Sequence, residues 1–144
     1  MQTHKIAIAL IAVGTTALAH GGVKNKDVLA RMEGMTALAD QVKVIGRMMK
    51  GEAAFDAAAA NAALQAISDE AESIPALFET EAQDPKSETL PLVWEEFDDF
   101  EQQALRLERS TAELSGSISD PADLRPAMKA VSAACSGCHE VYRE

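Results

Sequence analysis

The sequence predicts an all-α protein folded as an antiparallel four-helix bundle. Alanine is abundant and runs of β-branched residues are rare, a composition that favours helices over strands. In four segments, apolar residues recur three and four positions apart, the spacing that places them on one face of a helix. Short connections join most of these segments, so consecutive helices should run antiparallel around one core. We expect a single domain over residues 20–144.

Residues 1–19 have the pattern of a secretory signal peptide. Lys5 supplies a positive charge, an apolar run extends from Ile6 to Val13, and Ala17-Leu18-Ala19 has the small residues of a cleavage site. The apolar run is too short to span a bilayer, and we find no later segment that resembles a membrane span. We therefore expect export to the periplasm and a mature chain that begins at His20.

The first predicted helix covers about residues 26–50, with Asn25 as N-cap and Gly51 as stop. Its apolar stripe consists of Val28, Met32, Met35, Leu38, Val42, Ile45 and Met49. The second helix should begin at about Asp56, which suits an N-cap, and should end at Ile74, because the next residue is a proline. Its stripe consists of Ala60, Leu64, Ile67, Ala71 and Ile74.

An irregular connection from Glu79 to Leu90 should cross over the bundle. The third helix is predicted over residues 91–115, with a proline in its first turn and Gly116 as stop. Its stripe consists of Val93, Phe97, Phe100, Ala104, Leu107 and Leu114. The fourth helix should extend from about Asp120-Pro121 to about Arg143, and Pro126 either kinks its first turns or marks its true start.

The most informative motif is Cys135-Ser136-Gly137-Cys138-His139, near the end of the fourth predicted helix. Cys-x-x-Cys-His is the attachment signature of a c-type haem: each thiol can form a thioether with the porphyrin, and the histidine can bind the iron. In a helix the two cysteines and the histidine share one face. The motif therefore predicts one covalent haem c per chain, held near the C-terminal helix.

Two other interpretations use the same residues without haem. A zinc site needs four ligands, so Cys135, Cys138 and His139 would require a fourth from His20 or a carboxylate. A redox-active dithiol needs only the two cysteines, but such motifs usually start a helix next to a strand. A hydrolase or transferase is not indicated, since no Gly-rich phosphate loop and no Ser-His-Asp set is present. We expect no enzymatic reaction.

The charge balance restricts the partners. The chain has 13 basic and 23 acidic residues, a formal net charge of −10. Such an acidic surface disfavours nucleic acid as a partner. It is compatible with a redox partner protein that has a basic docking face, or with a small redox mediator, and it also keeps an exported protein soluble.

The whole predicted mature chain resembles the cytochrome c′ family, the class II c-type cytochromes. In this family the haem motif lies on the last of four helices, as here, whereas most c-type cytochromes carry it near the N-terminus. Weaker matches lie elsewhere in the chain: Arg31-x-x-x-Met35, Lys50-Gly51-Glu52 followed by Phe55-Asp56, Pro75-Ala76-Leu77-Phe78, Trp94 in Trp-Glu-Glu-Phe, and Tyr142-Arg143.

The resemblance implies two alternative functions that depend on Met35, which occupies the distal position of the family pattern. In low-spin members a methionine from the first helix binds the iron opposite the histidine and the protein transfers electrons. In five-coordinate members the distal residue only packs above the iron, and small gases such as NO or CO bind there. We favour an electron carrier in which His139 and Met35 are the axial ligands. The alternative is that Met35 only fills space in the core.

The resemblance also implies roles for three further residues. Arg31 should point toward a haem propionate, Arg143 should shield the proximal side or pair with a propionate, and Trp94 should lie against the haem edge. Each of these side chains also has an ordinary explanation, as a solvated arginine or a core aromatic residue. Family members often form antiparallel dimers through their first two helices, so the resemblance also implies a homodimer as one possible assembly.

Overall fold

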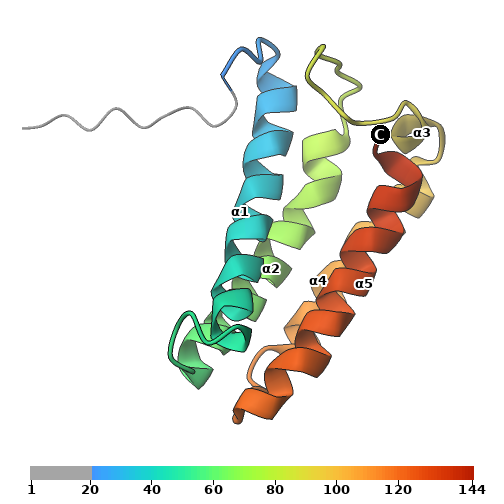
Figure 1. Ribbon diagram of the computed structural model, residues 1–144. Coiled ribbons are helices and arrows are strands. Elements are labelled where there is room, and N and C mark those ends of the chain that lie inside the picture. Colours follow the sequence, from blue (N-terminus) through green and yellow to red (C-terminus); the bar gives the residue numbers. More distant parts are fainter. Residues whose placement is uncertain (1–20) are drawn as a thin grey trace, which may run out of the picture.

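The computed structural model describes residues 21–144, and the predicted signal peptide at residues 1–19 lies outside them. In this part of the chain four long helices, α1 (Lys26–Met49), α2 (Ala57–Phe78), α4 (Phe97–Leu114) and α5 (Leu124–Tyr142), form the bundle. Consecutive long helices run in opposite directions (Figure 1). The predicted all-α antiparallel four-helix bundle is therefore confirmed. No helix among the described residues combines the length and the apolar character needed to cross a membrane.

The predicted caps of α1 and α2 are present. The side chain of Asn25 accepts hydrogen bonds from the backbone N–H groups of Asp27 and Val28, at 2.9 and 3.2 Å. Asp56 accepts a bond of 3.0 Å from the N–H of Ala59. Gly51 follows the C-cap of α1 with a φ of 72°, a left-handed conformation that glycine adopts without strain.

The prediction that α2 ends at Ile74 was wrong, because the helix continues through Pro75 to Phe78. Ile74 and Phe78 lie one turn apart and are both buried in the core, so packing favours the extra turn. The backbone carbonyls of Leu77 and Phe78 then accept hydrogen bonds from side chains of other helices, which stabilises the end of α2. Tertiary contacts thus offset the cost of an internal proline.

The predicted third helix is divided into two. A short helix, α3 (Leu92–Glu95), is followed by a break at Glu96, with φ −124° and ψ 42°, and then by α4. Because of this break, a new helix begins at the acidic segment, and Asp98 and Asp99 lie in the first turn of α4. Carboxylates are stabilised there by the partial positive charge of the helix end.

The last α-helix begins later than predicted, at Leu124 instead of near Asp120-Pro121. A 3₁₀ turn, η1 (Pro121–Asp123), precedes α5, and Asp120 and Asp123 cap it reciprocally. Pro126 is the third residue of α5, a position whose N–H has no acceptor within the helix, so a proline fits there. The helix starts before it, at Leu124, so Pro126 does not mark its start.

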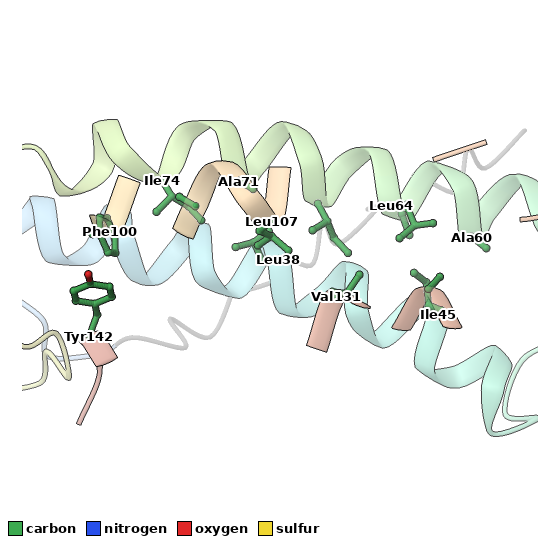
Figure 2. Close-up of a cluster of buried hydrophobic side chains, with 14 of the residues drawn as sticks. Leu38, Ile45, Ala60, Leu64, Ala71, Ile74, Phe100, Leu107, Val131 and Tyr142 are labelled. Atoms are coloured by element: carbon green, nitrogen blue, oxygen red, sulfur yellow. The ribbon is translucent and has the colours of Figure 1, made fainter. Parts of the chain in front are cut away.

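The core runs along the axis of the bundle and is lined by all four long helices (Figure 2). Leu64, Ile67 and Ile45 are at most 1 % exposed, and Leu64 and Ile45 lie toward one end of the core. Phe78, Phe100 and Tyr142 form an aromatic cluster at the opposite end. At that end the connection after α2 reaches the C-terminus: the N–H of Leu90 donates to the carbonyl of Tyr142 at 3.0 Å, next to an isolated bridge between Thr89 and Arg143. This connection crosses the bundle as predicted.

Candidate haem site

The last turns of α5 carry the three residues of the haem motif. Cys135 and Cys138 are free, half-buried thiols that pack against the core, and His139 is exposed. Gly137 faces α4, since a Cβ added there would lie 3.8 Å from Oε1 of Gln103. A helix turns about 100° per residue, so Cys135 and His139 lie on nearly the opposite side of α5 from Gly137.

That side of α5 is turned toward α1, the other neighbour of α5 in the bundle. α1 packs mainly on α2, and α5 mainly on α4, whereas α1 and α5 pack together less extensively than either pair. Met35 of α1 is half-buried at the edge of the core. The sequence-predicted ligands therefore come from two neighbouring helices that pack against each other less closely than the other neighbouring pairs of the bundle do.

Burial determines the protonation of these groups in the haem-free chain. It raises the pKa of Cys138 to about 11, with a further contribution from neighbouring Cys135, and it raises the pKa of Cys135 as well. Burial, and then the positive charge of Arg143, lower the pKa of His139. The imidazole is therefore mainly neutral at pH 7, the form in which histidine binds a metal.

The donor set fits a covalent haem. Two unpaired thiols and a neutral imidazole lie within little more than one helical turn, on apolar flanks that suit a porphyrin. Within residues 21–144, no three side chains of His, Cys, Asp or Glu type converge as a metal site. The zinc interpretation requires such a convergence, and His20, which it invoked as a possible fourth ligand, lies outside the described residues.

Arg31 lies inside the protein, with only 2 % of its surface exposed. Its Nε donates a hydrogen bond of 2.9 Å to the carbonyl of Leu77, Nη1 donates one of 2.9 Å to Ala82, and Nη2 donates to Thr80. Burial lowers the pKa of this guanidinium, and nearby Asp27 partly opposes the shift. Three backbone carbonyls are thus the hydrogen-bond partners of Arg31 within the protein, and its contact with a haem propionate stays a prediction.

Trp94 belongs to the same cluster. Its indole Nε1 donates a hydrogen bond of 2.8 Å to the carbonyl of Phe78. The guanidinium carbon of Arg31 lies 4.8 Å from the ring centre of Phe78 and 5.1 Å from that of Trp94, distances at which a cation is attracted to both rings. The structure thus joins two predicted site residues, Arg31 and Trp94, at the end of α2. The predicted contact of Trp94 with the haem edge stays a prediction.

Arg143 is the C-cap of α5, lies next to Thr89 of the crossing connection, and is exposed. Its Nε donates a 2.6 Å hydrogen bond to Oε2 of Glu88, and Nη2 completes an ion pair with the same oxygen. Glu88 and Asp99, which binds Tyr142, were not predicted as site residues. Their roles depend on which loop or helix meets α5 in space, and a single sequence carries no signal for that.

Taken together, a helical bundle with a Cys-x-x-Cys-His motif on its last helix defines a c-type cytochrome. Residues 26–143 match the family model described as "Cytochrome C'". The chain belongs to the cytochrome c′ family, and its cofactor is haem c, with the two cysteines of the chain available for one thioether-linked haem.

Similar proteins cover almost the whole chain. A cytochrome c′ of Rhodopseudomonas palustris is 32 % identical over 142 residues, covering 96 % of this chain and 97 % of the relative. A cytochrome c-554 of Cereibacter sphaeroides is 35 % identical over 147 residues, with coverages of 96 % and 95 %. The solved structure of cytochrome c′ from Rhodopseudomonas palustris superposes with a TM-score of 0.76 at 28 % identity, covering 84 % of this chain and 98 % of that one. The relatives thus include both cytochromes c′ and numbered c-type cytochromes.

Proposed function

We propose that this protein is an electron carrier in which His139 and Met35 bind the haem iron from opposite faces. The observation that supports this most directly is the position of Met35. It is half-buried on α1, the neighbour of α5 on the side that carries Cys135 and His139. The thioether sulfur of methionine is an established axial ligand of haem iron in cytochromes.

The haem supplies the one-electron chemistry, and the chain supplies binding, burial and electrostatics. The two cysteines attach the cofactor to α5, His139 offers a neutral imidazole, and α1 offers Met35. Methionine and histidine together favour a higher reduction potential than anionic axial ligands. A buried positive charge on Arg31, one turn from Met35, acts in the same direction because it disfavours the oxidised, more positive iron.

A five-coordinate, gas-binding cytochrome is the second candidate. One similar structure, the nitric oxide complex of a cytochrome c prime variant from Alcaligenes xylosoxidans, superposes with a TM-score of 0.70 at 26 % identity. In this alternative the proximal site is unchanged, and Met35 packs above the iron without binding it.

The proposed partner is a redox protein with a basic docking face, or a small redox mediator, in the periplasm. The net charge of −10 supports a basic partner. The exposed carboxylates Glu95, Glu96, Asp98 and Asp99 surround the junction of α3 and α4, and Asp99 is linked directly to α5 through Tyr142. A partner bound there would lie near the helix that carries the haem.

Visible absorption of the purified holoprotein, oxidised and reduced, with and without carbon monoxide, tests the proposal. We expect a sharp reduced α-band, the weak long-wavelength band of methionine-bound ferric haem, and no response to CO. A broad high-spin spectrum that shifts with CO would establish the gas-binding alternative instead. A colourless protein, produced together with haem-attachment machinery, would contradict both.

A further inference from the structure

Arg31 forms a clamp between α1 and the end of α2. The carbonyls that it binds, those of Leu77, Thr80 and Ala82, belong to the last turn of α2 and to the segment that leaves it. Carbonyls at a helix C-terminus carry partial negative charge and have no partner within the helix. The planar guanidinium satisfies several of them together, which a lysine cannot do with the same geometry.

The cation at this position has no carboxylate partner. Within residues 21–144 the ion pairs are Lys43 with Asp40 and Arg143 with Glu88, and neither involves Arg31. A buried charge is costly unless hydrogen bonds and dipoles replace its hydration. Three carbonyls and two aromatic faces provide that replacement here, so the side chain is held in one orientation.

The clamp is adjacent to the distal position. Arg31 and Met35 are four residues apart, so they lie one turn apart on one side of α1. Between them, Gly34 allows α1 to approach α2 closely, because a Cβ there would lie 2.9 Å from Cδ1 of Leu77, whose carbonyl Arg31 binds. On its other side α1 has only its limited packing on α5. The position of Met35 along and around the bundle is therefore set mainly from the α2 side.

We propose that Arg31 is a positioning residue for the axial methionine: its clamp on the end of α2 fixes the height and rotation of α1 at Met35. This rests on the proposed function, in which Met35 binds the iron. The propionate contact that the family resemblance implied for Arg31 stays a prediction, and the role proposed here depends only on contacts inside the protein. When the clamp is weakened, α1 should shift more freely and the methionine should leave the iron more often, even though no contact with the haem has been changed.

The test compares Arg31→Gln and Arg31→Lys with Asn61→Ala in the holoprotein. Asn61 is a matched control because its side chain also makes three bonds to backbone groups, to Gly116 N–H at 2.8 Å and to the N–H and carbonyl of Ile118 at 3.1 and 2.9 Å. It lies near the start of α2, at the opposite end of that helix from the Arg31 clamp. The measurements are thermal unfolding, the intensity of the methionine band, and the rate of CO binding to the reduced protein.

All three variants should unfold at lower temperature than the wild type. Only the Arg31 variants should also lose intensity in the methionine band and bind CO faster, by about tenfold or more. CO binds the population in which the methionine has left the iron, and a tenfold rise in that population corresponds to a shift of ~1.4 kcal/mol in its free energy. Arg31→Lys keeps the charge but not the planar fork, so it should resemble Arg31→Gln. If Arg31→Gln does not fold, the lysine variant alone decides.

Two results would overturn the inference in distinguishable ways. If the Arg31 variants lose stability but keep the wild-type methionine band and CO response, as Asn61→Ala should, the clamp is purely structural and the proposed function survives. If the wild type already binds CO and lacks the methionine band, the proposed function fails and this inference fails with it.

Discussion

The hydroxyl of Tyr142 donates a hydrogen bond of 2.8 Å to the carboxylate of Asp99, which joins the end of α5 to the first turn of α4. The ring of Tyr142 is buried, 3 % exposed, and meets Phe100 edge-on at 5.3 Å between ring centres (Figure 2). Tyr142 follows His139 by three residues, so this contact anchors the turn of α5 that carries the histidine of the haem motif. It also links the histidine helix to the acidic surface at the start of α4.

This link should make stability depend on pH. The hydrogen bond from Tyr142, followed by one from Gln103, holds the pKa of Asp99 below its usual value of 3.8. A depressed carboxyl pKa contributes stability that is present above that value and is lost as pH falls through the lower, folded-state pKa. Burial, and then Asp99, raise the pKa of Tyr142 above 10, so the hydroxyl stays protonated at neutral pH.

Tyr142→Phe should therefore unfold more easily than the wild type at neutral pH, because the hydrogen bond to Asp99 is lost. The difference should shrink as the pH is lowered from about 5 to about 2. Urea unfolding followed by circular dichroism at several pH values measures this. Asp99→Asn removes the carboxylate but keeps a side chain of the same size. It should likewise be less stable than the wild type at neutral pH, by a difference that shrinks as the pH falls. A difference between Tyr142→Phe and wild type that stays constant down to pH 2 would contradict the assignment.

Met35→Ala tests the distal ligand directly. Removing the thioether should leave an open coordination position, so we expect a high-spin spectrum and new binding of CO. The loss of a half-buried methionine should also cost about 1–3 kcal/mol of unfolding free energy. Met128→Ala is a control, because Met128 is a half-buried methionine on α5 that packs against the same core. The assignment fails if Met35→Ala retains the low-spin spectrum, or if Met128→Ala changes it equally.

The close approach of α1 to α2 can be tested at Gly34. Replacing an exposed helical glycine by alanine gains about 1 kcal/mol, because alanine has the higher helix propensity. At Gly34 the new methyl group would lie 2.8 Å from Glu70 and 2.9 Å from Leu77, whereas nothing lies within 4 Å at Gly46. Gly46→Ala should stabilise the protein, and Gly34→Ala should be less stable than Gly46→Ala by about 1–2 kcal/mol. Equal gains in thermal unfolding would show that α2 yields easily at this contact.

Arg143→Ala should have a small effect on stability. The side chains of Arg143 and Glu88 are 51 % and 56 % exposed, and exposed ion pairs contribute about 1 kcal/mol or less. The backbone hydrogen bonds that join the crossing connection to the C-terminus do not involve the side chain and should persist. We expect a slight decrease in melting temperature that disappears in high salt. A loss of more than about 2 kcal/mol would indicate a buried role for this arginine.

The sequence by itself determined the helical bundle and the haem motif. Apolar periodicity locates helices because it reflects which residues must leave water, and the caps Asn25 and Asp56 act within a few residues of themselves. Cys135, Cys138 and His139 are close in sequence, so helical geometry alone places them together. Each of these features depends on residues that are close together in the sequence.

Tertiary structure decided what depends on contacts between distant segments. α2 passes Pro75 because Arg31 and Trp94 bind the carbonyls beyond it, although they lie 46 and 16 residues from their partners in sequence. The same contacts place Arg31 inside the protein rather than at its surface. Tyr142 meets Asp99 across 43 residues of sequence. Such partners are backbone groups or common side chains with no pattern of their own, so their pairing follows only from how the four helices pack.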